Sequence, residues 1–150
     1  MNIVSSNDRK DPYGNAKFLI EIDGIVQGDF VEAIIPEVVT NVIEYRTGNE
    51  FIRVRKLPGL TEDSNLILIG GIIESMELYN WYKLVRQGKM KSARKNVAIT
   101  LLDEERNSGA RWEVENAWPC KYSISPFYAQ GRNIVVESFE ITFEAMKRVQ

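Results

Sequence analysis

The chain contains no histidine and only one cysteine, Cys120, among its 150 residues. Without histidine, Ser-His and Cys-His nucleophile pairs cannot form, and most zinc sites lose a usual ligand. A single cysteine excludes an internal disulfide and a thiolate metal cluster. Cys120 follows Pro119 in a strand-like segment, where we expect a small buried apolar residue and not a reactive thiol. The sequence therefore predicts no catalytic residue, no metal site and no cofactor.

Long apolar runs and an excess of charge of one sign are also missing. No stretch approaches the roughly 18 apolar residues that span a bilayer, and residues 1–12 lack the apolar region of a signal peptide. The formal net charge of −2 gives no broad basic field. We therefore expect no direct membrane anchor, no specific nucleic-acid binding, and folding and assembly in the cytoplasm.

Short strand patterns dominate what is present. Phe18, Ile20 and Ile22 share one face of an extended segment, and Asp23-Gly24 is a hairpin turn signal. The run 66–69 is apolar on both faces, which is typical of a covered strand. With 44% hydrophobic residues, the chain is long enough to bury one sizeable core. We expect a single domain over residues 1–150, with residues 1–12 flexible or ordered only on assembly.

One helix is predicted, at about residues 75–88. Ser75 is the expected N-cap, Glu77 lies in the first turn, and Gly88 is the expected stop. An apolar stripe recurs at i, i+3, i+4 and i+7, namely Leu78, Trp81, Tyr82 and Val85. The predicted fold class is therefore mainly β, a single compact β-barrel or sandwich with one flanking helix.

A short basic segment follows that helix and carries Lys89, Lys91, Arg94 and Lys95. It reads as a loop, and two interpretations stay open. It is either a solvated surface or a subunit contact matched by acidic residues such as those at 103–105. The aromatic residues Tyr79, Trp81, Tyr82, Trp112 and Trp118 are expected in the core, with Tyr79 a candidate subunit contact.

The segment from Glu44 to Asn65 predicts an extended hairpin arm, with Pro58-Gly59 ending its second strand. A solvated excursion of this length has no need for apolar residues, yet it carries Phe51, Ile52, Val54, Leu57 and Leu60. Such an arm exposes unpaired strand edges and apolar side chains, which favour aggregation. Pairing with another copy of the chain removes both problems, so the arm predicts an assembly.

The last predicted strand, Ile134 to Glu144, alternates between an apolar and a polar face. Val135, Phe139, Ile141 and Phe143 form the apolar face, which belongs to the core. The polar face carries Ser138, Glu140, Thr142 and Glu144.

Several short motifs together resemble one family in wording and order. Before the helix these are residues 11–15 (DPYGN), 21–25 (EIDGI), 42–46 (VIEYR) and 55–61 (RKLPGLT). In and after it they are residues 77–82 (ELYNWY), 101–104 (LLDE), 111–112 (RW) and 116–119 (NAWP). The chain resembles the tube proteins of contractile tails, those of tailed phages and phage-tail-like injection particles, from about Asp11 to Val149.

The resemblance implies a structural subunit and not an enzyme. In this family each subunit is a small β-barrel with a helix on its flank, six copies form a ring, and stacked rings form a hollow tube inside a contractile sheath. The implied partners are further copies of the chain, the sheath protein, a baseplate or spike protein or a second tube paralogue, and cargo in the lumen. The implied location is a phage tail or a released extracellular particle.

Two sets of residues become candidate sites in such a tube. The arm contact set is Arg53, Arg55, Lys56, Leu57, Pro58 and Leu60. The polar face of the last strand (Ser138, Glu140, Thr142 and Glu144) faces either the lumen or the outer surface under the sheath, and we favour the lumen. The alternatives are a monomeric β-barrel that binds a small ligand, a type VI secretion-like tube or effector carrier, and a carboxylate enzyme.

Overall fold

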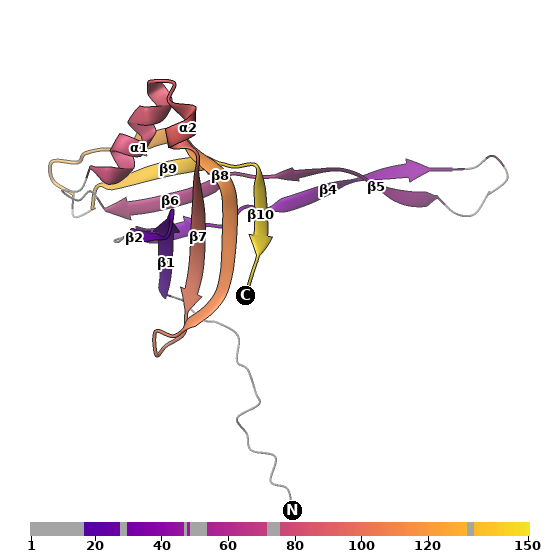
Figure 1. Cartoon of the computed structure of the whole chain (residues 1–150), viewed down its shortest axis with the longest axis horizontal. Helices are drawn as coiled ribbons and strands as arrows, with labels where there is room; N and C mark the ends of the chain where they lie inside the picture. Colours follow the sequence, from indigo (N-terminus) through magenta and orange to yellow (C-terminus); the bar gives the residue numbers. More distant parts are fainter. Residues whose placement is uncertain (1–16, 28–29, 47, 49–53, 72–75, 132–133) are drawn as a thin grey trace, which may run out of the picture.

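The computed structural model describes residues 17–27, 30–46, 48, 54–71, 76–131 and 134–150. These residues form ten strands and two helices (Figure 1). In chain order the elements are β1 (Lys17–Ile22), β2 (Ile25–Gln27), β3 (Phe30–Ile34), β4 (Val38–Tyr45), β5 (Arg55–Asp63), β6 (Leu66–Gly71), α1 (Glu77–Arg86), α2 (Met90–Ala93), β7 (Lys95–Leu102), β8 (Ser108–Ile124), β9 (Val136–Thr142) and β10 (Ala145–Arg148).

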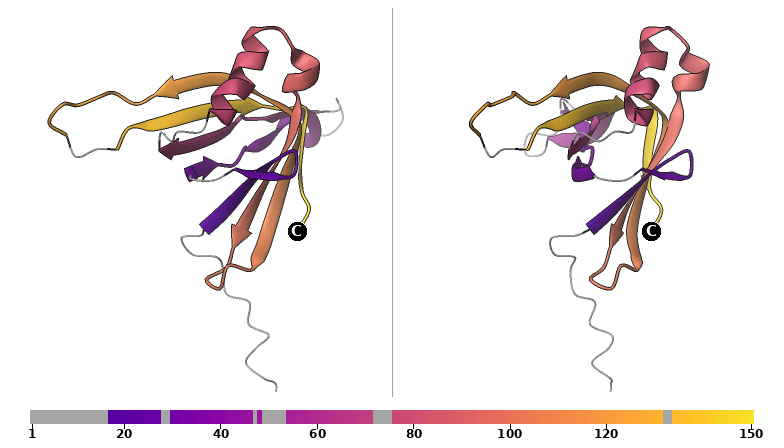
Figure 2. Two further views of the ribbon diagram at one scale, coloured as in Figure 1. Left: turned by 60° about the vertical axis from the view of Figure 1, so that its left-hand side comes forward. Right: turned by 90° about the vertical axis from the view of Figure 1, so that its left-hand side faces the viewer.

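Eight strands form one antiparallel sheet in the order β2-β1-β7-β8-β9-β6-β3, with β10 also paired to β8. The predicted class, mainly β with a flanking helix, is confirmed. Over the described residues the sheet stays open and does not close into a barrel. It folds over itself instead, so that the part around β1 and β7 faces the part around β6 and β9 (Figure 2).

The fold-over depends on β8, which is 17 residues long and belongs to both parts of the sheet. Its first half pairs with β7 and β10, and its second half pairs with β9. Between the halves, Asn116 has φ 52°, in the left-handed region that asparagine tolerates better than most residues. Its side-chain amide donates to Glu144 Oε2 at 2.8 Å, which fixes the bend.

The core lies between the two parts of the sheet. Each strand contributes alternate residues, as a pleated strand with one buried face must. The largest fully buried side chains among the described residues are Ile20, Leu66, Leu68, Val97, Ile99, Val114, Pro119, Phe139 and Ile141. Phe18, Ile20 and Ile22 do share the inner face of β1, and Asp23-Gly24 does turn the chain into β2 with φ of 50° and 79°.

Helix α1 closes one end of the core with its apolar stripe. Trp81 is 3% exposed, and its indole Nε1 donates to the carbonyl oxygen of Ala93. The helix ends at Arg86, and Gly88 at φ 74° reverses the chain as predicted. The predicted N-cap, Ser75, lies outside the described residues. The basic segment that follows is not simply a loop: Met90–Ala93 forms the short helix α2, with Ala93 buried beneath Trp81.

The last predicted strand, residues 134–144, corresponds to the shorter β9, and a further strand that the sequence analysis did not predict follows it. Strand β9 ends at Thr142, and β10 continues along the same edge of β8 from Ala145. The interruption lies opposite the bend at Asn116, where the ladder cannot remain regular. Across the gap the Glu144 N–H donates to the carbonyl oxygen of Glu115 at 3.0 Å.

The Tyr122 ring connects the sheet to the helix. From β8 it packs 5.5 Å from the Tyr79 ring, 5.9 Å from that of Tyr82 and 5.1 Å from that of Phe139, measured between centroids. Its hydroxyl donates to Glu137 Oε1 at 3.0 Å. Burial, the hydrogen bond and the nearby carboxylate raise the pKa of Tyr122 to about 12. These contacts explain Glu137, the one charged residue that breaks the apolar pattern of β9.

In the Tyr122→Phe variant, the free energy of unfolding should fall less at alkaline pH than it does in the unsubstituted protein. An unfolded tyrosine has a pKa of ~10. Since the folded pKa is higher, the stabilisation is fully present below pH ~10 and is lost as pH rises toward ~12. Tyr122→Phe should cost about 0.5–1.5 kcal/mol at pH 8 and flatten the decline between those two pH values. Urea unfolding at pH 8, 10 and 11 measures both effects. Tyr128→Phe, at an exposed position, is the control, and an unchanged alkaline slope in Tyr122→Phe would contradict the assignment.

Candidate assembly interface

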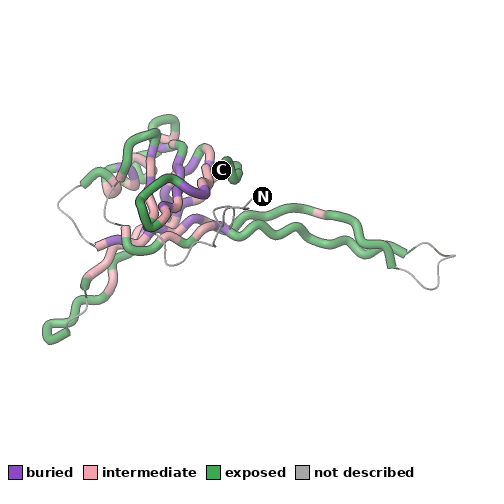
Figure 3. The backbone as a smooth tube through the Cα atoms, turned by 90° about the horizontal axis from the view of Figure 1, so that it is seen from below, coloured by how far each residue is buried: buried purple, intermediate pink, exposed green. Residues whose placement is uncertain are grey.

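Strands β4 and β5 form a separate two-stranded ribbon that leaves the body of the molecule (Figures 1 and 3). We call this ribbon, Val38–Asp63, the arm. It begins earlier than the predicted Glu44, because β4 starts six residues nearer the body. Every residue of β4 is exposed. A two-stranded ribbon has no hydrophobic face of its own to bury and is marginally stable alone in water.

The base of the arm is fixed by two hydrogen bonds. The Glu37 N–H donates to Ser64 Oγ at 2.7 Å, and the Ser64 N–H donates to the Glu37 carbonyl oxygen at 2.9 Å. Through these short connections β3 continues into β4 and β5 continues into β6. The arm is therefore an extension of the β3–β6 pair beyond the core.

Pro58 and Gly59 do not end the second arm strand, and that prediction is wrong. Strand β5 continues to Asp63, with a register shift opposite Thr40 and Val42. Proline is tolerated in the ribbon because its missing N–H costs nothing on an outward-facing edge. Gly59 fits a crowded position, since a Cβ there would lie 3.1 Å from both the Asn41 carbonyl oxygen and Ile43 Cγ1, and these neighbours would have to shift.

Five of the six candidate arm residues lie on β5, and Arg53 lies outside the described residues. Arg55, Lys56, Leu57 and Pro58 face Tyr45, Glu44, Ile43 and Val42, respectively, across the ribbon. Leu60, in the irregular part of the ladder, is 75% exposed. Each face of the outer arm thus carries one apolar pair and one polar pair. Nothing in the chain itself covers the apolar pairs over the described residues, so the arm has the composition of a contact surface.

The candidate lumen residues divide between two environments. Ser138, Glu140 and Thr142 alternate with the buried Phe139 and Ile141, so they occupy the face of β9 that points away from the core, as predicted. Glu144 follows the end of the strand, where its carboxylate bonds Asn116 and forms an ion pair with Arg94 at 3.1 Å. Glu144 therefore fixes the bend of β8.

Within the chain, Arg94 of the basic segment forms an ion pair with Glu144. Lys89 and Lys91 are exposed at α2. The ion pair is itself exposed and contributes little to stability.

The part of the sheet formed by β8, β9, β6 and β3 has an open edge on each side. On one side, β3 pairs only with β6 among the described strands. On the other side, the second half of β8, residues 118–124, pairs only with β9. Two unpaired edges on one short sheet favour edge-to-edge association with other copies, because their backbone N–H and C=O groups can pair with those of another strand.

Cys120 is exposed, which contradicts its predicted burial. After the bend at Asn116, Ala117 and Pro119 lie on the buried face of β8, so the next residue, Cys120, lies on the exposed face. Sγ lies 3.3 Å from the Glu140 carbonyl oxygen. Partial desolvation, and next the Glu140 charge, raise the pKa of this thiol above its ordinary value, so it is mostly protonated at neutral pH.

Sequence reasoning missed one exposed apolar feature, the loop between β8 and β9. Phe127 is 74% exposed, Tyr128 64% and Ile134 78%. A signal was available: residues 123–131 contain no charged residue, although 27% of the chain is charged.

The described residues offer no sign of a metal centre or a membrane-spanning helix. Among them no cluster of three or more histidine, cysteine, aspartate or glutamate side chains could hold a metal ion. In the same residues no helix has the length and apolarity needed to cross a membrane.

Comparisons with known proteins place these features in context. A family model described as T4-like virus tail tube protein gp19 matches residues 14–147. No curated protein sequence matches the chain.

Three solved structures share the fold. A chain of the sheath-tube complex of the PVC extracellular contractile injection system is 21% identical with a TM-score of 0.77, the match covering 99% of this chain and 100% of that one. A chain of the anti-feeding prophage baseplate, a 6-fold symmetrised structure, is 19% identical with a TM-score of 0.79, covering 94% and 97%. Hcp1 from Flavobacterium johnsoniae is more distant, 15% identical with a TM-score of 0.53, covering 87% and 93%. At these identities the likeness shows the fold.

Proposed function

The chain belongs to the T4-like virus tail tube protein family, and on that premise we propose that it is the structural subunit of the inner tube of a contractile, phage-like tail or injection particle. The subunits form six-fold rings, the rings stack into a hollow tube, and contraction of a surrounding sheath drives the tube through a target envelope. The arm carries this proposal, because its exposed apolar pairs need a second copy of the chain.

Ring formation follows from the two open edges. Edge-to-edge pairing of β3 in one subunit with the second half of β8 in the next would continue the four-strand ladder around the ring. After closure no lateral edge remains, which is the way large barrels remove the hazard of exposed edges. A six-fold arrangement is supported by the symmetry of the anti-feeding prophage baseplate structure, which contains a chain of the same fold.

The partners in this proposal are structural. Chains of this fold occur in solved structures of a sheath-tube complex, a baseplate and a tube-terminating cap. We expect the chain, residues 1–150 as one tube domain, to contact the corresponding sheath, baseplate or spike proteins, or a second tube paralogue. Assembly takes place in the cytoplasm, before the particle acts as a phage tail or a released injection particle. The subunit itself performs no chemistry.

The proposal is tested by the state of the purified protein. At high micromolar concentration we expect six-fold rings or stacked tubes by negative-stain electron microscopy, and a mass several times that of one chain by size-exclusion chromatography with light scattering. A strictly monomeric protein that also forms no tubes when co-expressed with its sheath and baseplate proteins would refute the proposal. That result would favour the alternative of a monomeric barrel with a small ligand.

The outer face of β9 is the proposed channel wall. Ser138, Glu140 and Thr142 lie opposite the core face, and joining the open edges turns their face toward the ring axis or away from it. We propose the axis, because short polar and acidic side chains would not hold an anionic cargo. Glu144 is the weaker member of this set, because its carboxylate already bonds Arg94 and Asn116.

Thiol labelling of assembled tubes distinguishes the lumen from the outer surface. In a Cys120→Ser background, Ser138→Cys should react with a small maleimide. It should resist a maleimide carried on a large polymer, which cannot enter the channel, until the tubes are dissociated. Lys91→Cys, on α2 over the opposite side of the sheet, is the control and should react with both reagents in bare tubes. Equal reaction of Ser138→Cys with the large reagent would place this face on the outside.

A further inference from the structure

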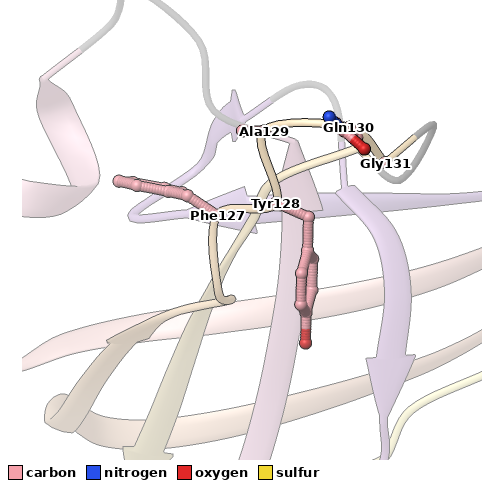
Figure 4. A pocket seen from close by; sticks show the side chains of 5 residues that line it. All are labelled: Phe127, Tyr128, Ala129, Gln130 and Gly131. Atoms are coloured by element: carbon pink, nitrogen blue, oxygen red, sulfur yellow. The ribbon is translucent and has the colours of Figure 1, made fainter.

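The β8–β9 loop presents an apolar surface that nothing in the subunit explains. From Ser123 to Gly131 the chain carries no charge. Phe127 and Tyr128 are consecutive, both largely exposed, and their side chains diverge around a hollow that opens to solvent (Figure 4). Ile124, at the end of β8, adds a further exposed aliphatic side chain to the same loop. Aromatic residues exposed in this way are typical of the anchors of protein interfaces.

The loop lies at the end of the molecule away from the arm. In Figure 1 the arm extends to one side of the body, whereas β9 and the loop extend to the other. Figure 3, seen from below, shows the same separation. Both projections belong to the same four-strand ladder. The β3–β6 pair continues into the arm at one end, and the β8–β9 pair continues into the loop at the other.

We propose that the β8–β9 loop, centred on Phe127 and Tyr128, is the docking site for the arm of a second copy of the chain in the neighbouring ring; this rests on the proposed function. Subunits stacked along the direction of the ladder bring the arm of one copy to the loop of the next. The contact joins two different surfaces, so each copy carries one of each and the series does not close.

Chemical complementarity supports this occupant. The middle of the arm is uncharged on both strands: Asn41, Val42 and Ile43 lie on β4, and residues 57–60 (Leu-Pro-Gly-Leu) lie on β5. The charged residues Glu44 and Lys56 lie nearer the tip and Glu62 and Asp63 nearer the base. The described part of the loop before its gap, residues 125–131, carries no charged residue and matches that middle section, because burying the two apolar surfaces against each other leaves no charge of either one buried without a partner.

The first experiment separates stacking from ring formation. Phe127→Ser combined with Tyr128→Ser should leave rings intact and raise the protein concentration needed for tube growth by at least ~10-fold, as loss of interface anchors does. Ile25→Ser with Val26→Ser, which removes two consecutive exposed apolar side chains from β2, is the matched control and should leave the tubes normal. Normal tubes from the loop variant, or tubes lacking only a terminal protein, would overturn the inference.

Cross-linking identifies the occupant. In a Cys120→Ser background, Leu57→Cys and Tyr128→Cys in the same chain should form disulfides between copies under mild oxidation. Each cross-linked series takes one subunit from each successive ring and has no closed end. Denaturing gels should therefore show a series of bands that extends beyond the mass of a hexamer. A series that stops at the hexamer would place the partner within the same ring and overturn the inference, as would the absence of cross-links in well-formed tubes. If unsubstituted protein forms neither rings nor tubes, the proposed function fails instead.

Discussion

Replacing Ile141 with alanine should lower the free energy of unfolding by about 2–5 kcal/mol, because the lost side-chain atoms leave a cavity in a close-packed core. Ile141 is fully buried on β9, among core residues from both parts of the sheet. Urea denaturation of the dissociated subunit measures the change. The variant should also assemble poorly, since a smaller fraction of it is folded.

The control is the same substitution at an exposed position. Ile43 lies on the arm and is 52% exposed, so Ile43→Ala should cost the isolated subunit far less while still weakening tube growth. The two variants thus separate folding from assembly. A loss below about 1 kcal/mol at Ile141 would mean that this part of the core can repack, and it would contradict the expected cost.

Reversing two charges on the arm, Arg55→Glu with Lys56→Glu, should block tube growth while the subunit still folds. These residues occupy the outer half of β5, at a predicted contact with acidic groups of another copy. One exposed ion pair is worth only about 0.2–1 kcal/mol, but the contact recurs in every subunit of a ring. Sedimentation and electron microscopy measure growth, and circular dichroism checks folding.

The matched control is Lys89→Glu with Lys91→Glu, which makes the same change in net charge. Both positions are exposed: Lys91 lies in α2, and Lys89 immediately precedes it. Normal tubes are expected from it. Lys56 also lies opposite Glu44 within the ribbon. The swap Glu44→Lys with Lys56→Glu keeps that cross-strand pair, and it shows whether the arm needs the pair or the position of the positive charge. Normal tubes from the double charge reversal would argue against an electrostatic arm contact.

Local patterns predicted the elements whose determinants are close in sequence. The alternation of Phe18, Ile20 and Ile22, the turn at Asp23-Gly24 and the helical stripe around Trp81 all depend on neighbouring residues. The apolar content of the arm also allowed an assembly to be inferred, because it conflicts with exposure and needs no knowledge of the fold.

What could not be predicted depends on partners distant in the sequence. The exposure of Cys120 follows from the bend at Asn116, which changes the residues of β8 that face the core from the set containing Val114 to the set containing Ala117 and Pro119. The end of β9 at Thr142 and the separate, unpredicted strand β10 follow from the bend at Asn116. Pro58-Gly59 was predicted to end a strand, because the sequence does not show that this segment pairs with Val42 in a two-stranded ribbon, where proline is tolerated. Contacts between candidate-site residues in an assembly depend on how copies of the chain are arranged. A single sequence shows which residue types the candidate surfaces contain, but not which of them meet.

The paired hydrogen bonds between Glu37 and Ser64 have a mechanical consequence. Because β4 and β5 run straight on from β3 and β6, a pull along the arm acts parallel to the strands. The interstrand hydrogen bonds are then loaded in shear and share the force, whereas a sideways pull would break them one after another. Glu37 and Ser64 hold the junction where such peeling would begin. If thrust passes from ring to ring through the arms, each subunit receives it along its most resistant axis.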